Sequence, residues 1–130
     1  MELKDIISIG GRPGLFKVVT KRKNELIVES VSEGKKIFIY ALDKVSSLED
    51  ISIYTDSEDV PLVDVYEKLY EIEKGNKSID HKSDPKILKE KMIEILPDYD
   101  QDRVYNSDLK KLFHWYNMLI EAGLLVNNKD

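Results

Sequence analysis

The spacing of apolar residues changes near residue 60, and this change limits the possible fold more than any other feature of the chain. Before it, between Leu15 and Tyr54, short runs of β-branched and aromatic residues alternate with polar turns, which is typical of half-buried strands. After it, apolar residues recur every three or four positions, as on one face of a helix. The sequence therefore predicts an α+β protein with a sheet-forming part at 1–56 and a helical part at 61–126.

The sheet-forming part is expected to contain strands in the runs that are richest in β-branched and aromatic residues. These runs lie at 15–19, 26–31, 36–40 and 51–54. The segment 5–9 is compatible with a further strand, and Gly34 suits a turn that needs a positive φ. Short strands joined by tight turns favour a small antiparallel β-barrel of the meander type, because closure removes the exposed sheet edges.

The second part is expected to form a three-helix segment. Pro61 fits the first position of one helix, and Asp84 and Ser107 are suited to cap the other two. The residues expected to end the helices are Gly75, Pro97 and Gly123. Their apolar stripes must be covered, so the helices pack on one another, on the barrel or on a partner. The sequence leaves these three arrangements open.

The formal net charge of −5 comes from the second half of the chain. Residues 1–55 carry nine Lys or Arg and eight Asp or Glu, whereas residues 56–130 carry eleven and seventeen. A chain-wide basic field that would attract DNA or RNA is therefore absent. Nucleic acid is accordingly a disfavoured partner, and only a local basic cluster in the first half is compatible with it.

Composition also excludes several kinds of site and segment. The chain has no cysteine, so it offers no disulfide framework, no thiolate ligand and no cysteine nucleophile. No apolar run approaches the roughly 18 residues that a membrane-spanning helix needs, and we expect no membrane partner. Residues 1–5 lack the layout of a signal peptide, which favours a cytoplasmic location.

Three acidic residues near position 100 have the alternating spacing of a calcium-binding loop. Asp98, Asp100 and Asp102 correspond to the first ligands of an EF-hand. The later positions do not fit, because Arg103 stands in the place of the loop glycine and Leu109 in that of the bidentate glutamate. A solvated acidic turn is therefore the preferred interpretation, and cation binding is the alternative.

Other residues that could bind a ligand or a metal ion also have simpler structural interpretations. The segment 10–14 contains three glycines and a proline, which indicates a sharp turn; a phosphate-binding loop would need a Gly-Lys-Ser/Thr ending and a following helix. His81 and His114 are not spaced as a metal-binding pair. We therefore expect no cofactor, no metal ion and no catalytic residue.

A basic hairpin face is the first candidate binding surface. Its residues are Lys21, Arg22, Lys23 and Lys35, in the turns after the first two strong strands. If the hairpins are neighbours, these side chains lie beside strand aromatics such as Phe38, and small barrels that bind nucleic acid combine such groups. The alternative, which the acidic total favours, is that the lysines are exposed turn residues and the aromatics belong to the core.

Trp115 is the second candidate, on the last predicted helix. It lies beside Tyr116 near the edge of the apolar stripe. A half-exposed tryptophan is a good interaction anchor, because it offers a large contact area at a low cost in conformational entropy. It is equally suited to be the contact between the helix and the barrel, and the sequence does not decide between the two roles.

Five stretches of the chain resemble an uncharacterised family of small bacterial proteins, a domain of unknown function. They are LKDIISI (3–9), RPGLFK (12–17), KVSSLEDISIY (44–54), DYDQDRVY (98–105) and WYNML (115–119). The resemblance implies that a β N-terminal part and a helical C-terminal part belong together, and it implies no activity, substrate or catalytic residue. At the level of the fold, the expected barrel also resembles Tudor-like and KOW-like modules, a likeness that does not assign function.

These observations predict a non-enzymatic interaction module that binds a protein or a peptide. The alternative is an RNA-binding or ribosome-associated module that uses the basic hairpin face. An enzyme ranks third, because the chain shows no motif of chemical specificity. The sequence identifies neither the partner nor the oligomeric state.

Overall fold

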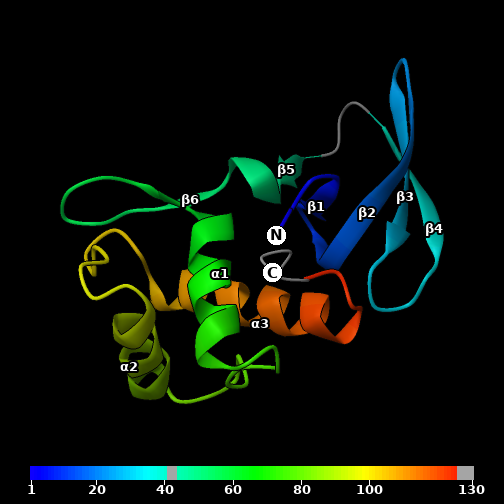
Figure 1. The fold of residues 1–130 in the computed structure, drawn as a ribbon. Coiled ribbons are helices and arrows are strands. Elements are labelled where there is room, and N and C mark those ends of the chain that lie inside the picture. Colours follow the sequence, from blue (N-terminus) through cyan, green and yellow to red (C-terminus); the bar gives the residue numbers. More distant parts are fainter. Residues whose placement is uncertain (41–43, 126–130) are drawn as a thin grey trace.

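The computed structural model describes residues 1–40 and 44–125, which form a sheet on one side and helices on the other (Figure 1). The strands of the main sheet are β1 (Ile6–Ile9), β2 (Arg12–Arg22), β3 (Glu25–Ser30), β4 (Lys36–Tyr40) and β5 (Val45–Ser47). Their spatial order is β4-β3-β2-β1-β5, and every neighbouring pair is antiparallel. The α+β class with an antiparallel sheet and a helical C-terminal part is therefore confirmed.

The sheet does not close into the predicted barrel. Strands β4 and β5 are its two edges, and they do not pair with each other in the described residues. Strand β5 pairs only with β1 and then gives way to a short 3-10 helix, η1 (Leu48–Asp50). The long β2–β3 hairpin is bulged between Val18 and Thr20, which increases its local twist. Leu26 of β3 and Val45 of β5 still border one cavity, so the sheet curves towards closure without completing it.

The segment 51–54 differs from its prediction as a strand of the main sheet. Its central residues form β6 (Ser52–Ile53), which pairs with β7 (Val60–Pro61) in a separate two-stranded sheet. The backbone N–H of Leu62 then donates to the carbonyl of Ile51 at 2.9 Å, so this small sheet sets where the first helix begins. The β-branched residues correctly indicate a strand. This strand pairs with β7, which follows it in the chain.

Two apolar cores form because successive strand residues face opposite sides of the sheet. Ile6 and Ile7 are neighbours in β1 and both are only 4% exposed. Ile7 packs with residues of β2, β3 and β4 in a small core. Ile6 and Leu15 join the main core, which contains residues of every helix. The sheet therefore contributes to the same core as the helices.

The helices of the described residues are α1 (Leu62–Ile72), α2 (Pro85–Ile95) and α3 (Asn106–Glu121). The predicted cap of α2 is confirmed, because the Asp84 carboxylate accepts from the backbone N–H of Lys86 at 3.0 Å. The predicted cap of α3 at Ser107 is wrong: Tyr105 occupies the cap position, and its N–H donates to Asp108 Oδ2 at 2.9 Å. Within the described part of the chain, none of these helices is long and apolar enough to cross a membrane.

Helix α3 lies between the sheet and the other helices, and buried polar contacts fix its position (Figure 1). The Tyr66 hydroxyl of α1 donates to the carbonyl of Leu112 at 2.8 Å. On the sheet side, a Cβ atom at Gly14 would lie 3.3 Å from the Cε of Met118, so the start of β2 approaches α3 closely. This close approach brings the β1–β2 turn beside the middle of the helix.

Candidate functional site

A cavity of about 570 Å³ opens where the β1–β2 turn faces helix α3. One wall is formed by the segment 10–14 and the other by Lys111, His114 and Trp115 of α3. Ile51, after the 3-10 helix, also lines the cavity. The cavity is therefore built from parts of the chain that lie about 100 positions apart.

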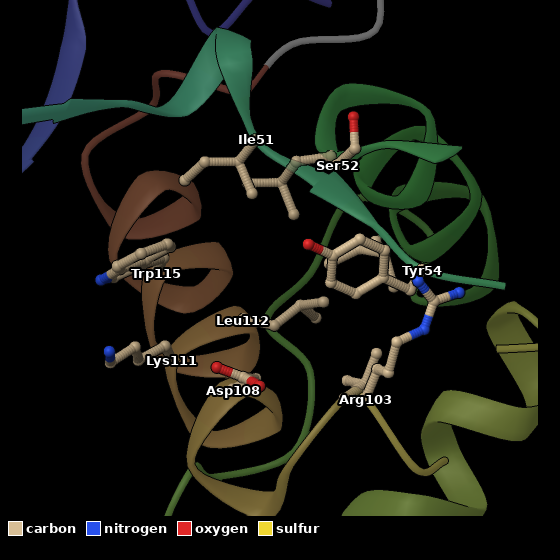
Figure 2. A pocket seen from close by; sticks show the side chains of 11 residues that line it. Ile51, Ser52, Tyr54, Arg103, Asp108, Lys111, Leu112 and Trp115 are labelled. Carbon is tan, nitrogen blue, oxygen red and sulfur yellow. The ribbon is translucent and has the colours of Figure 1, made fainter. Parts of the chain in front are cut away.

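A second cavity of about 230 Å³ adjoins the first. Ile51, Lys111 and Trp115 line both cavities, and we call the continuous depression around these residues the Trp115 groove. Figure 2 shows Trp115 and Lys111 projecting from the same side of α3, with Ile51 across from the tryptophan. The spacing of four residues between Lys111 and Trp115 places them one turn apart on one helix face.

Glycines shape the sheet wall of the groove. Gly10 and Gly11 make the two-residue turn between β1 and β2, so the turn predicted at 10–14 is correct for its first two residues, whereas 12–14 belong to β2. Gly11 has a φ of +82°, a conformation that glycine adopts without steric cost. The Gly10 N–H donates to the carbonyl of Lys44 at 2.8 Å, and a Cβ at Gly10 would lie only 3.2 Å from the Lys44 Cβ. The turn therefore holds Lys44 beside the groove.

The far end of the groove is closed by a cation stacked on an aromatic ring. The Arg103 guanidinium lies 4.4 Å from the centroid of the Tyr54 ring, as Figure 2 shows. Its Nε donates to Asp100 Oδ2 at 2.7 Å. This hydrogen bond, helped by the backbone N–H of Asp102, lowers the pKa of Asp100. The ion pair and the stacking together fix the direction of Arg103.

The larger cavity is cationic although the whole chain is acidic. Arg12, Lys44 and Lys111 line it, and none of the described lining residues is Asp or Glu. All three side chains are exposed, and none forms an ion pair with another described residue. The described lining of the larger cavity therefore carries positive charge beside an aromatic side chain, whereas Asp108 lines the smaller cavity.

The structure shows the packing of Trp115, while its role as an interaction anchor stays a prediction. It is half-buried and packs against the main core, as a helix-to-sheet contact would. It also lines both cavities of the groove. Trp115 therefore contacts the core on one side and borders the groove on the other.

The other predicted binding residues are not brought together. The three basic residues at 21–23 lie at the β2–β3 turn, where Arg22 forms an ion pair with Glu25 at 3.3 Å. Lys35 lies before β4, at the opposite end of β3, and its Nζ is 3.9 Å from a Glu33 carboxylate oxygen. Arg22 lies opposite Glu25 of β3 and Lys35 beside Ser30, five residues further along, which is about 17 Å of strand. The basic turns form separate patches.

The aspartates at 98–102 form the acidic turn that we preferred. Asp100 Oδ1 accepts from the backbone N–H of Asp102 at 2.9 Å, and its other oxygen is held by Arg103. The described residues include no group of three or more His, Asp or Glu side chains that is placed to hold a metal ion.

His81 and His114 are far apart in sequence but adjacent in the structure. Their rings stack with centroids 3.9 Å apart. Burial lowers the pKa of His114, and the neighbouring His81 lowers it further. Because His114 borders the groove, the stacked pair joins the loop before α2 to the groove wall.

Sequence reasoning missed Arg12, Lys44 and Lys111 as possible contacts. The spacing of Lys111 and Trp115 on one helix was a usable signal, because residues four apart share a helix face. Arg12 was visible only as part of a glycine-rich turn. Nothing local indicates that Lys44 lies beside that turn, since the contact depends on how β5 pairs with β1.

The comparisons with known proteins agree with the architecture. One family model, described as domain of unknown function DUF5606, matches residues 3–48, and another, domain of unknown function DUF6852, matches residues 51–119. A solution NMR structure of a structural-genomics target from Bacteroides vulgatus is 46% identical, with a TM-score of 0.78; the match covers 96% of this chain and 90% of that chain. The search of curated proteins gave no match. The resemblance to an uncharacterised bacterial family is thus confirmed, and because the second model spans more than half of the chain, the protein belongs to the family described as domain of unknown function DUF6852.

Proposed function

We propose that this protein is a non-enzymatic interaction module of the cytoplasm that binds a segment of another protein in the Trp115 groove. The observation that carries the proposal is the position of Trp115, half-buried against the main core and open to two adjoining cavities. Tryptophan is enriched among the residues that dominate binding energies at interfaces. Because the core already orients this side chain, binding would cost little further ordering.

The shape of the groove supports a peptide-sized ligand. The larger cavity, at about 570 Å³, lies within the range of about 300–1,000 Å³ that is usual for ligand sites. Ile51 and Trp115 offer apolar contact, and the surrounding side chains offer hydrogen-bond donors. Asp108, which lines the smaller cavity, already accepts the N–H of Tyr105 through one carboxylate oxygen. This combination suits recognition of a segment better than acid–base chemistry.

RNA binding through the outer face of the sheet is a second candidate. Phe38 and Tyr40 of β4 are 54% and 61% exposed, because their neighbours Ile37 and Ile39 take the inner positions. Lys36 shares their side of the strand. Exposed aromatic rings beside cations are the groups that stack bases and contact phosphates. The acidic net charge of −5 weighs against this candidate.

Site-specific crosslinking separates the two candidates. A photoreactive phenylalanine analogue replaces Ser52, an exposed residue at the groove, or Lys89, an exposed control residue on α2. In native lysate we expect a protein adduct from position 52 and not from position 89. The adduct should resist nuclease and should weaken when the exposed Lys111 is changed to Glu.

Equal adducts from both positions would contradict the groove as the binding site. An adduct that disappears with nuclease would favour the RNA candidate instead. Circular dichroism of each variant verifies that the fold is intact, so a lost adduct reports on binding.

A further inference from the structure

We propose that the Trp115 groove recognises an acidic, extended segment of its partner, an inference that rests on the proposed function. Carboxylates of the segment would be held by Arg12, Lys44 and Lys111, and an apolar side chain would lie on Trp115 and Ile51.

The charge of the larger cavity favours an acidic ligand. The chain has 25 acidic and 20 basic residues, yet the described lining of the larger cavity has three cations and no carboxylate. Some basic residues elsewhere do have a counter-charge, such as Lys91, whose Nζ lies 2.9 Å from Glu73 Oε1. Cations that share a cavity without a counter-charge repel one another, and an anionic ligand would relieve that repulsion.

The placement of the cations suits an extended ligand. Arg12 lies in β2 opposite Ile9 of β1, and Ile9 is in turn opposite Val45 of β5, the residue after Lys44. Two inter-strand spacings, about 10 Å, therefore separate the backbone at Arg12 from the backbone at Val45. An extended peptide advances about 3.3 Å per residue and its alternate side chains share one face, so acidic side chains two or four residues apart, about 7 or 13 Å, bracket this span. Lys111 provides a third cation from the opposite wall, on α3.

The small number of aromatic side chains in the groove favours a peptide over a polynucleotide. Binding of single-stranded nucleic acid uses a series of aromatic platforms along a basic track. The groove has Trp115 in its centre, while its far end carries Tyr54 under Arg103 and the carboxylate of Asp108. The net charge of −5 also opposes the approach of a long polyanion. A short acidic segment with an apolar residue fits both the charge and the length.

Ligand binding to the intact protein can be followed by its tryptophan fluorescence, because Trp115 is the one tryptophan of the chain. The probes are a short synthetic peptide rich in Glu and Asp with a central Phe, the same peptide with Gln and Asn in place of the acids, and an oligouridylate of similar charge. We expect the acidic peptide to change Trp115 emission and the amide shifts of groove residues. The amide-containing peptide should bind at least about tenfold more weakly, equivalent to about 1.4 kcal/mol.

Matched variants then test the cations one at a time. Arg12→Gln, Lys44→Gln and Lys111→Gln should each weaken the acidic peptide several-fold, and Lys111→Arg should retain its affinity. Lys89→Gln on α2 removes the same charge away from the groove and should change nothing beyond the small effect of net charge. All four positions are exposed, so the variants are expected to fold.

Equal binding of the acidic and amide peptides would overturn the inference, as would tighter binding of the oligouridylate. If neither peptide binds while the protein adduct at position 52 persists, the acidic ligand is wrong and the proposed function stands. If the adduct is missing as well, both fail.

Discussion

The imidazole rings of His81 and His114 stack with their centroids 3.9 Å apart and their planes 14° from parallel. His114 belongs to α3, whereas His81 belongs to the loop between α1 and α2. Asp80 lies 3.5 Å from His81 Nδ1. The stacked histidines therefore join α3 to the loop between α1 and α2, and the strength of this contact depends on histidine protonation.

We expect the stability of the protein to fall as the pH drops below the ordinary histidine pKa of 6.5. The pKa of His114 is lowered in the folded state, chiefly by burial and then by His81. The unfolded chain therefore binds a proton in a range where the folded chain does not, and stability rises with pH across that range. Melting temperatures measured from pH 7.5 downwards, together with an NMR titration of His114, test this.

His114→Gln should flatten this part of the pH profile. His81→Gln should move the pKa of His114 back towards 6.5, because both the neighbouring charge and part of the burial are lost. The Asp80 and Asp100 carboxylates, whose pKa values are lowered from 3.8, contribute in a separate range at lower pH. An unchanged profile in His114→Gln would show that another group controls the transition.

Asn117→Ala should detach the loop before α2 from α3. The Asn117 side chain accepts from the N–H of Ser78 at 2.7 Å and donates to the carbonyl of Ile79 at 3.0 Å. Loss of both bonds leaves two part-buried backbone groups unpaired, at a cost of about 1–3 kcal/mol in the free energy of unfolding. Urea denaturation measures this cost.

Glu121→Gln is the matched control for that variant. Glu121 and Lys77 form an exposed ion pair between the same helix and the same loop. Exposed pairs contribute about 0–1 kcal/mol, so this variant should unfold almost as the native chain does. Equal destabilisation by the two variants would assign the attachment to charge rather than to the amide.

Gly14→Ala should destabilise the protein more than Gly11→Ala. Both positions have positive φ, +88° and +82°, and an L residue there costs about 1–2 kcal/mol. At Gly14 the new methyl group would also lie 3.3 Å from the Cε of Met118, whereas at Gly11 nothing lies within 4 Å. Denaturation of the two variants side by side measures the extra cost; equal values would mean that Met118 moves aside freely.

Tyr66→Phe should lower the free energy of unfolding by about 1 kcal/mol, because a buried hydroxyl loses its hydrogen bond. The hydroxyl donates to the carbonyl of Leu112, and burial raises the Tyr66 pKa well above 10.0. Consistent with this, the phenol should not ionise in the folded protein as the pH is raised through 10, which absorbance at alkaline pH checks. Tyr105→Phe, at a position that is 64% exposed, provides the control.

Local signals predicted β1 to β4, β6 and the three helices but not β5 or β7, and tertiary contacts decided how the strands pair. The Asp84 cap and the turn at Gly10 and Gly11 depend on neighbouring residues, so the sequence revealed them. Ser107 was an equally good local cap, but Asp108 reaches back to Tyr105 and sets the helix start there.

Closure of the sheet and assembly of the groove required information that no short stretch contains. Whether β5 reaches β4 depends on the twist of the whole sheet and on where the 3-10 helix leaves it. Trp115 could be selected from its helix position, whereas Arg12 and Lys44 become its neighbours only after the β1–β2 turn has docked on α3.

Because the sheet and the helices share the main core, the stability of each depends on the other. Ile6, Leu15 and Leu48 come from the N-terminal half, and their packing partners include residues of α1 and α3. Splitting the chain between residues 48 and 51 would expose the apolar face of each half to water. The two stretches that family models treat separately are therefore expected to melt in one cooperative transition and to be inherited as a single unit.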